Sequence, residues 1–88
     1  MKFIRVIEET DQTKQALFQH IFNGCHYLYS YVKRPDAGVE ETAIFECDST
    51  GKVDNYTDLY MADGYVSSSD ALRAFMDSDR FSDMGQNC

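Results

Sequence analysis

The alternation of apolar and polar side chains marks the extended segments of this chain. Residues 2–8 carry apolar side chains on both alternating faces, which is typical of a strand inside a sheet. Residues 25–34 alternate strictly, with three tyrosines on one face, and residues 42–47 alternate in the same way. Both patterns predict strands. After them, the sequence predicts either a fourth strand from Val53 onward or a short helical turn at 59–61.

A helical period replaces this alternation between the first two predicted strands. Four apolar side chains recur at i, i+1, i+4 and i+5 and form one stripe: Leu17, Phe18, Ile21 and Phe22. Thr10 or Asp11 supplies a side-chain oxygen for the N-cap, and Gly24 stands where a left-handed residue would end the helix. We therefore predict a helix from about Asp11 to Asn23.

A second helix is expected near the end of the chain. Ser67 and Asp70 have the spacing of a capping box, and apolar residues follow them at helical intervals. The pattern predicts a short helix that ends at about Ser78. Residues 79–88 show no periodicity and are expected to form a flexible tail, which leaves residues 1–78 as one domain.

Together these elements predict an α+β fold. Their order is β-α-β-β-(β)-α, where the strand in parentheses is the uncertain one after Val53. Two helices on one face of a mostly antiparallel sheet would make a small two-layer sandwich. The chain has 88 residues, 6 Phe and 6 Tyr, so we expect a small core that is rich in aromatic side chains.

The net charge of the chain and its distribution limit the kinds of partner that the protein is expected to bind. The formal net charge is −7. Residues 1–35 hold five basic and three acidic residues, a net +2, whereas residues 36–88 hold three basic and twelve acidic residues, a net −9. Phosphate backbones and anionic lipids repel such a surface, so we expect neither direct nucleic-acid binding nor membrane binding. A basic protein partner is compatible with it, although acidic residues also serve solubility alone.

Cysteine usage and the start of the sequence bear on the compartment. The cysteines are Cys25, Cys47 and Cys88, an odd number without the spacing of a disulfide framework. The first residues, MKFIRVIEE, lack the apolar core of a signal peptide, and no stretch is apolar enough to span a bilayer. We therefore expect a cytoplasmic protein with free thiols.

Residues with metal-binding or nucleophilic side chains are few. The candidates for zinc are His20, Cys25, His26 and Cys47. They form no C-x-x-C pair, and Cys25 and His26 point to opposite faces of a strand, so we predict no metal site and no cofactor. A Cys–His pair for nucleophilic catalysis would need a meeting in space that the spacing does not require, and the leading expectation is that the protein is not an enzyme.

Tyrosines and acids are the most prominent surface candidates. Six tyrosines occur after residue 26, and eight acids fall between residues 36 and 63. Tyrosine is enriched at protein interfaces, and acids steer a basic partner during encounter. The simpler interpretation is that the rings cover a thin core. The residues predicted to bind a partner are Tyr29, Tyr31, Tyr56 and Tyr60 as anchors, with Asp54, Asp58 and Asp63 as steering charges.

The leading functional hypothesis is a small, acidic, non-enzymatic module that binds a basic protein. One version, by analogy with short acidic inhibitors of the phage type, blocks a nucleic-acid-binding protein by imitating phosphate spacing. Two alternatives stay open. One is a small-ligand or nucleotide-binding domain with an aromatic pocket, at the interface of a homo-oligomer such as a homodimer. The other is a hydrolase or transferase that uses a Cys–His pair.

Overall fold

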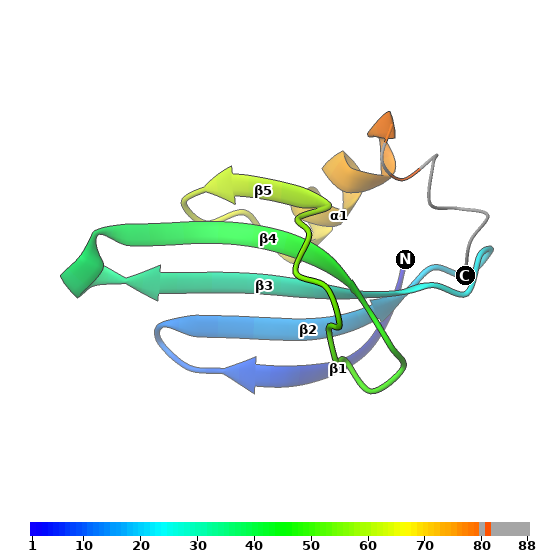
Figure 1. Ribbon diagram of the computed structural model, residues 1–88, viewed down its shortest axis with the longest axis horizontal. Helices are drawn as coiled ribbons and strands as arrows, with labels where there is room; N and C mark the ends of the chain where they lie inside the picture. The colour runs from blue at the N-terminus through cyan, green and yellow to red at the C-terminus, as the bar shows by residue number, and fades with distance from the viewer. Residues whose placement is uncertain (80, 82–88) are drawn as a thin grey trace.

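The computed structural model describes residues 1–79 and 81. It is a five-stranded antiparallel sheet in which each strand pairs with the next along the chain. One α-helix follows the strands, so the order is β-β-β-β-β-α (Figure 1). The elements are β1 (Lys2–Glu9), β2 (Thr13–Gln19), β3 (His26–Arg34), the 3₁₀ turn η1 (Pro35–Ala37), β4 (Val39–Cys47), β5 (Tyr60–Asp63) and α1 (Ser68–Met76).

The predicted sandwich with two helices on one face is wrong, because the segment predicted as the first helix is strand β2. The four residues of the predicted apolar stripe are not buried together. Leu17 and Phe18 are buried, whereas Ile21 and Phe22 are exposed. A strand with both faces covered buries neighbouring residues in just this way, and the same pair also fits a helix. The sequence pattern was therefore ambiguous, and the pairing of β2 with β1 and β3 decides it.

Short side-chain bonds to the backbone close the turns on either side of β2. Thr10 Oγ1 accepts from the backbone N–H of Gln12 and of Thr13, at 3.2 and 3.0 Å. After the strand, His20 Nδ1 accepts from the N–H of Phe22 at 3.2 Å, and Gly24 takes a left-handed φ of 76°. Thr10 and Gly24 were predicted to begin and end a helix, which is wrong, because they lie in turns that join strands.

The other predicted elements are mostly confirmed. The first, second and third predicted strands correspond to β1, β3 and β4, and the second predicted helix is α1. However, β1 is a mostly exposed edge strand and not the strand inside a sheet that its pattern predicted. Ser67 Oγ caps α1 by accepting from the N–H of Asp70 at 3.2 Å. The strand expected from Val53 is wrong, and so is the helical turn at 59–61, because a long loop leads into β5. Of the predicted tail, residues 80 and 82–88 lie outside the described residues.

The core lies between α1 and one face of the sheet, called here the helix face. Tyr27, Ile44 and Phe75 are completely buried there, and the rings of Tyr27 and Phe75 meet edge to face at 5.1 Å. The helix packs on β3, β4 and β5. Because apolar burial is the main favourable term in folding, this half of the sheet holds most of the stabilising contacts.

The opposite face, called here the loop face, is covered by residues 48–59. This loop leaves the end of β4, crosses the sheet towards β1 and returns to β5 (Figure 1). Arg5 donates from Nη2 to the carbonyl of Thr50 at 2.6 Å, and the loop places Gly51 against Ile7. Gly51 has a φ of 92°, which favours glycine, and a side chain there would have to displace the end of the Ile7 side chain.

Candidate functional site

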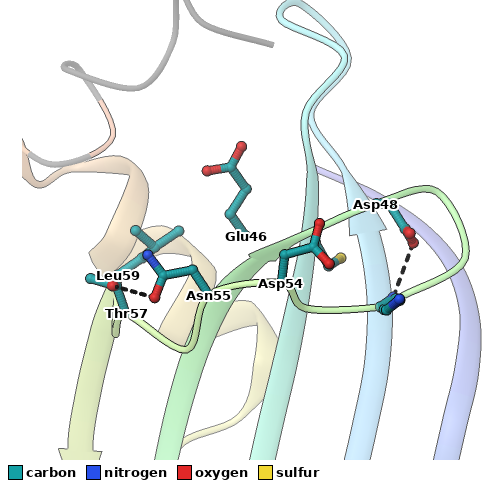
Figure 2. A pocket seen from close by; sticks show the side chains of 8 residues that line it. Glu46, Asp48, Asp54, Asn55, Thr57 and Leu59 are labelled. Carbon is teal, nitrogen blue, oxygen red and sulfur yellow. Dashed lines mark hydrogen bonds between the residues drawn. The ribbon is translucent and has the colours of Figure 1, made fainter.

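A hollow of about 290 Å³ lies where β4 ends and the 48–59 loop begins. Figure 2 shows its lining side chains around the end of β4 and along the loop that follows it. The lining residues are Glu46, Cys47, Asp48, Lys52, Asp54, Asn55, Thr57 and Leu59. Three of these carry carboxylates and one carries an ammonium group, so the hollow has an acidic lining. Its volume is near the low end for small-molecule sites and is large enough for one long side chain.

Asp48 holds the first turn of the loop. Its Oδ1 accepts from the Thr50 N–H at 2.8 Å, from the Thr50 hydroxyl at 2.6 Å and from the Lys52 N–H at 3.0 Å. The bonds from Thr50 and Lys52 favour the charged form and hold the pKa of Asp48 below its usual value. Asp48 therefore stays ionised and positions the loop, because its oxygen is already engaged by the protein itself.

Asp54 and Glu46 present carboxylates to the open side of the hollow. Figure 2 shows both groups projecting to the same side of the sheet end, one from the loop and one from β4. Asp54 and Glu46 are both exposed. Nearby, the Thr57 hydroxyl bonds to Asn55 Oδ1 at 3.0 Å. The arrangement places negative charge at the opening of the hollow, with neutral polar side chains beside it.

Cys47 lies beneath this rim as a free cysteine. Burial, with smaller contributions from the charges of Asp48 and Glu46, raises its pKa to about 12. The thiol is therefore protonated near neutral pH and is a weak nucleophile. His26 is its cross-strand partner in the β3–β4 register.

The remaining metal and thiol candidates do not converge on the hollow. Among residues 1–79 and 81, no three or more His, Cys, Asp or Glu side chains form a group that could hold a metal ion. His20 lies in the turn after β2. Cys25 is buried in the core cluster of the helix face.

Two of the predicted anchor tyrosines are in the core. Tyr29 is 4% exposed and Tyr31 is 6% exposed. The Tyr29 hydroxyl donates to the Val66 carbonyl at 2.6 Å, and the Tyr31 hydroxyl donates to Glu40 Oε2 at 2.6 Å. Burial, more than any neighbouring group, raises the pKa of Tyr29 to about 12. These two hydroxyls thus connect β3 to the segment before α1 and to the start of β4.

The other predicted residues divide between the loop and β5. Tyr56 is 70% exposed, and its ring meets Phe45 edge to face at 5.3 Å. Asp54 and Asp58 flank it on the same loop, and Asp54 lines the hollow. Tyr60 and Asp63 begin and end β5, and Asp63 pairs with Glu41, five residues before Glu46 along β4. The structure therefore brings Asp54, Tyr56 and Asp58 together on one loop and leaves Asp63 apart.

The sequence argument missed several residues that line the hollow. Glu46, Asn55 and Thr57 line it, and Asp48 builds its turn, but none of these four residues was among those predicted to bind a partner. A signal was present, because Asp followed two residues later by Thr favours a local side-chain turn. The run of Asp, Asn and Thr between Val53 and Leu59 also indicated a loop and not a strand.

Comparison of the chain with protein families, with curated proteins and with solved structures finds no match. The described residues contain no helix whose length and hydropathy would allow it to cross a membrane.

Proposed function

We propose that this protein is a non-enzymatic binding module that takes a basic segment of a partner protein into the hollow at the end of β4. The observation that carries the proposal is the acidic hollow beside an exposed aromatic ring. The lining of the hollow has three carboxylates and a single lysine, and Tyr56 stands next to it at 70% exposure. Such a site suits an arginine or lysine side chain.

Each group has a separate role in this proposal. Asp54 and Glu46 attract the cation, since both present carboxylates at the opening. Tyr56 offers its ring to the cation, because the side chain is 70% exposed and its ring meets that of Phe45 edge to face. A guanidinium stacked on a tyrosine contributes about 0.5–1 kcal/mol at an exposed site. Asp48 supports the others by fixing the turn.

The nature of the partner follows from the same charges. Residues 36–88 carry a net −9, which repels nucleic acid and attracts proteins with basic surfaces. A protein whose basic groove normally holds nucleic acid presents such a surface. An occupant of that groove with this charge would act as an inhibitor, which is the finer version of the proposal.

The proposal is tested with an arginine-rich peptide as the probe and surface-based kinetics as the readout. We expect Asp54→Asn to lower kon, because the steering charge is lost, and Tyr56→Ala to raise koff, because a contact is lost. A loss of about 1 kcal/mol or more at Tyr56, near fivefold in Kd, is the expectation for an interface anchor.

Two matched controls separate the site from general charge. Asp36→Asn removes the same charge at η1, the turn between β3 and β4, away from the end of β4 where the hollow lies. Tyr65→Ala removes an exposed ring that lies against Tyr31 on the helix face. Both controls should bind like the wild type. Equal kinetics for all four variants and the wild type would rule out the hollow as the site.

A further inference from the structure

The part of the helix face formed by β1 and β2 is not covered by α1. Figure 1 shows α1 beside β4 and β5, across the sheet from β1, and no second helix covers β1 and β2 in the described residues. Phe3 is 55% exposed there and Val6 is 50% exposed. A groove of about 280 Å³ runs along this half. Its lining includes Phe3, Val6, Ala16 and Phe18 from the two strands, with Tyr65 and Ser68 from the α1 side.

An irregularity in β1 places two apolar side chains on this face. Phe3 pairs with Phe18, and Val6 pairs with Ala16, so both face the groove although they are three residues apart. In a regular strand, residues three apart point to opposite faces. The register shifts between Phe3 and Arg5 change that parity, in the way β-bulges re-aim side chains. The result is a large apolar residue and a β-branched one that both stay about half exposed on this face.

The charges along β1 are complementary to those of a second copy. Lys2 and Arg5 lie in its first half, and Glu8 and Glu9 lie in its second half. When two such strands run antiparallel, the basic half of each lies beside the acidic half of the other. Within the described residues, β1 has a neighbouring strand on one side only. We propose that a second copy of this chain docks along β1 in the antiparallel sense.

The charge of the whole molecule favours this edge over the other. Residues 1–35 form β1 to β3 and carry a net +2, whereas the net −9 lies in the rest of the chain. Two copies that meet at β1 keep the acidic residues of β4, β5 and α1 away from the contact, and this limits repulsion. The opposite edge, β5, has only four residues and carries Asp63.

The position of α1 selects the arrangement. A two-fold axis perpendicular to the sheet places both helices on the same side of the joined sheet and at its outer parts, because α1 packs on β3 to β5. A face-to-face packing with antiparallel strands would instead bring the two helices into collision. Because bulges disturb main-chain pairing at an edge, the contact depends on side chains, mainly Phe3, Val6 and the charged residues.

A charge-reversal cycle tests the proposal, with the dimer Kd from analytical ultracentrifugation as the readout. Lys2→Glu and Glu9→Lys should each raise the Kd, by about tenfold, because each replaces attraction with repulsion at two symmetric positions. The double variant should recover most of the affinity, since it restores opposite charges in both copies. Single variants with the dimer Kd of the wild type, or a double variant whose Kd stays high, would overturn the antiparallel arrangement.

A second pair of variants tests the apolar strip. Val6→Asp should abolish the dimer, whereas Met61→Asp, at a side chain of similar exposure (48%) on β5, should leave it intact. Thermal melts of both variants show whether each still folds. A wild type that sediments as a monomer at every concentration would overturn the proposal and favour a different occupant. The peptide kinetics of the hollow are independent of this result, so each idea can fail alone.

Discussion

The two halves of the helix face differ in what covers them. Under α1, Tyr27 of β3 and Ile44 of β4 are completely buried. On β1, Phe3 and Val6 remain about half exposed on the same face. Full burial of a large apolar side chain contributes about 1.5–3 kcal/mol, so the covered half stabilises the fold and the bare half contributes little. The difference indicates that β1 is free to serve association.

The sharpest test of this contrast replaces one phenylalanine in each half by alanine. Phe75→Ala should lower the free energy of unfolding by about 3–5 kcal/mol, because it empties a fully buried site against Tyr27. Phe3→Ala should cost at most about 1 kcal/mol, mainly its edge contact with Phe18. Urea denaturation of both variants, at concentrations below dimer formation, gives the comparison. Equal losses would contradict it.

Thr42 tests the polar part of the covered half. Its buried hydroxyl donates to the Gly64 carbonyl at 2.8 Å and accepts from the Val66 N–H at 3.1 Å. Thr42→Val removes both bonds and leaves the Val66 N–H without its acceptor, which should cost about 1–3 kcal/mol. Thr57→Val, at an exposed position on the loop, is the matched control and should have little effect on urea denaturation. Similar losses in the two variants would show that burial of Thr42 is not what matters.

The start of α1 should contribute a smaller amount. Ser67→Ala removes the cap on the Asp70 N–H, and loss of such a cap typically costs about 1 kcal/mol. Ser69→Ala, within the first turn and exposed, should be neutral or slightly stabilising, since alanine is the better helix former. The melting temperatures of the two variants therefore should move in different directions. A lower value for Ser69→Ala alone would contradict the capping assignment.

The smallest effect near neutral pH, but a distinct one in alkali, comes from Tyr29. Its pKa is raised from 10.0 to about 12 in the folded protein, chiefly by burial. Because the folded protein favours the neutral hydroxyl, Tyr29 contributes to the free energy of unfolding below pH 10.0. This contribution is lost as the pH rises towards 12. Tyr29→Phe should therefore lose less stability than the wild type over this interval, as followed by unfolding at stepped pH. Parallel curves would show that Tyr29 does not drive the alkaline loss.

Local patterns were enough for the elements whose alternation or capping is unambiguous. β3 and β4 alternate clearly, β1 is a run of extended residues with apolar side chains on both faces, and Ser67 caps α1. β2 could not be recognised, because buried neighbours such as Leu17 and Phe18 fit a doubly covered strand and a helix equally well. Only the pairing with strands on both sides distinguishes them, and single-sequence reasoning does not contain that information.

The candidate site was predictable in part. Tyr56 and Asp54 were named from their chemistry, and the structure places them on one loop beside the hollow. The hollow itself depends on the return of the 48–59 loop across the sheet. That return rests on contacts such as Arg5 with Thr50, which are 45 residues apart, and no local pattern reports them. The burial of Tyr29 and Tyr31 depends in the same way on α1 and on residues 65–68.

The central claim is that the end of β4 binds a basic segment, and residue-resolved NMR tests it most directly. An arginine-rich peptide is titrated into labelled protein while amide shifts are followed, with a glutamate-substituted peptide as control. The account predicts saturable shifts of the amides from Glu46 to Leu59, while the amides of β1 respond only to dilution of the protein. Shifts elsewhere, or equal shifts with the control peptide, would contradict it.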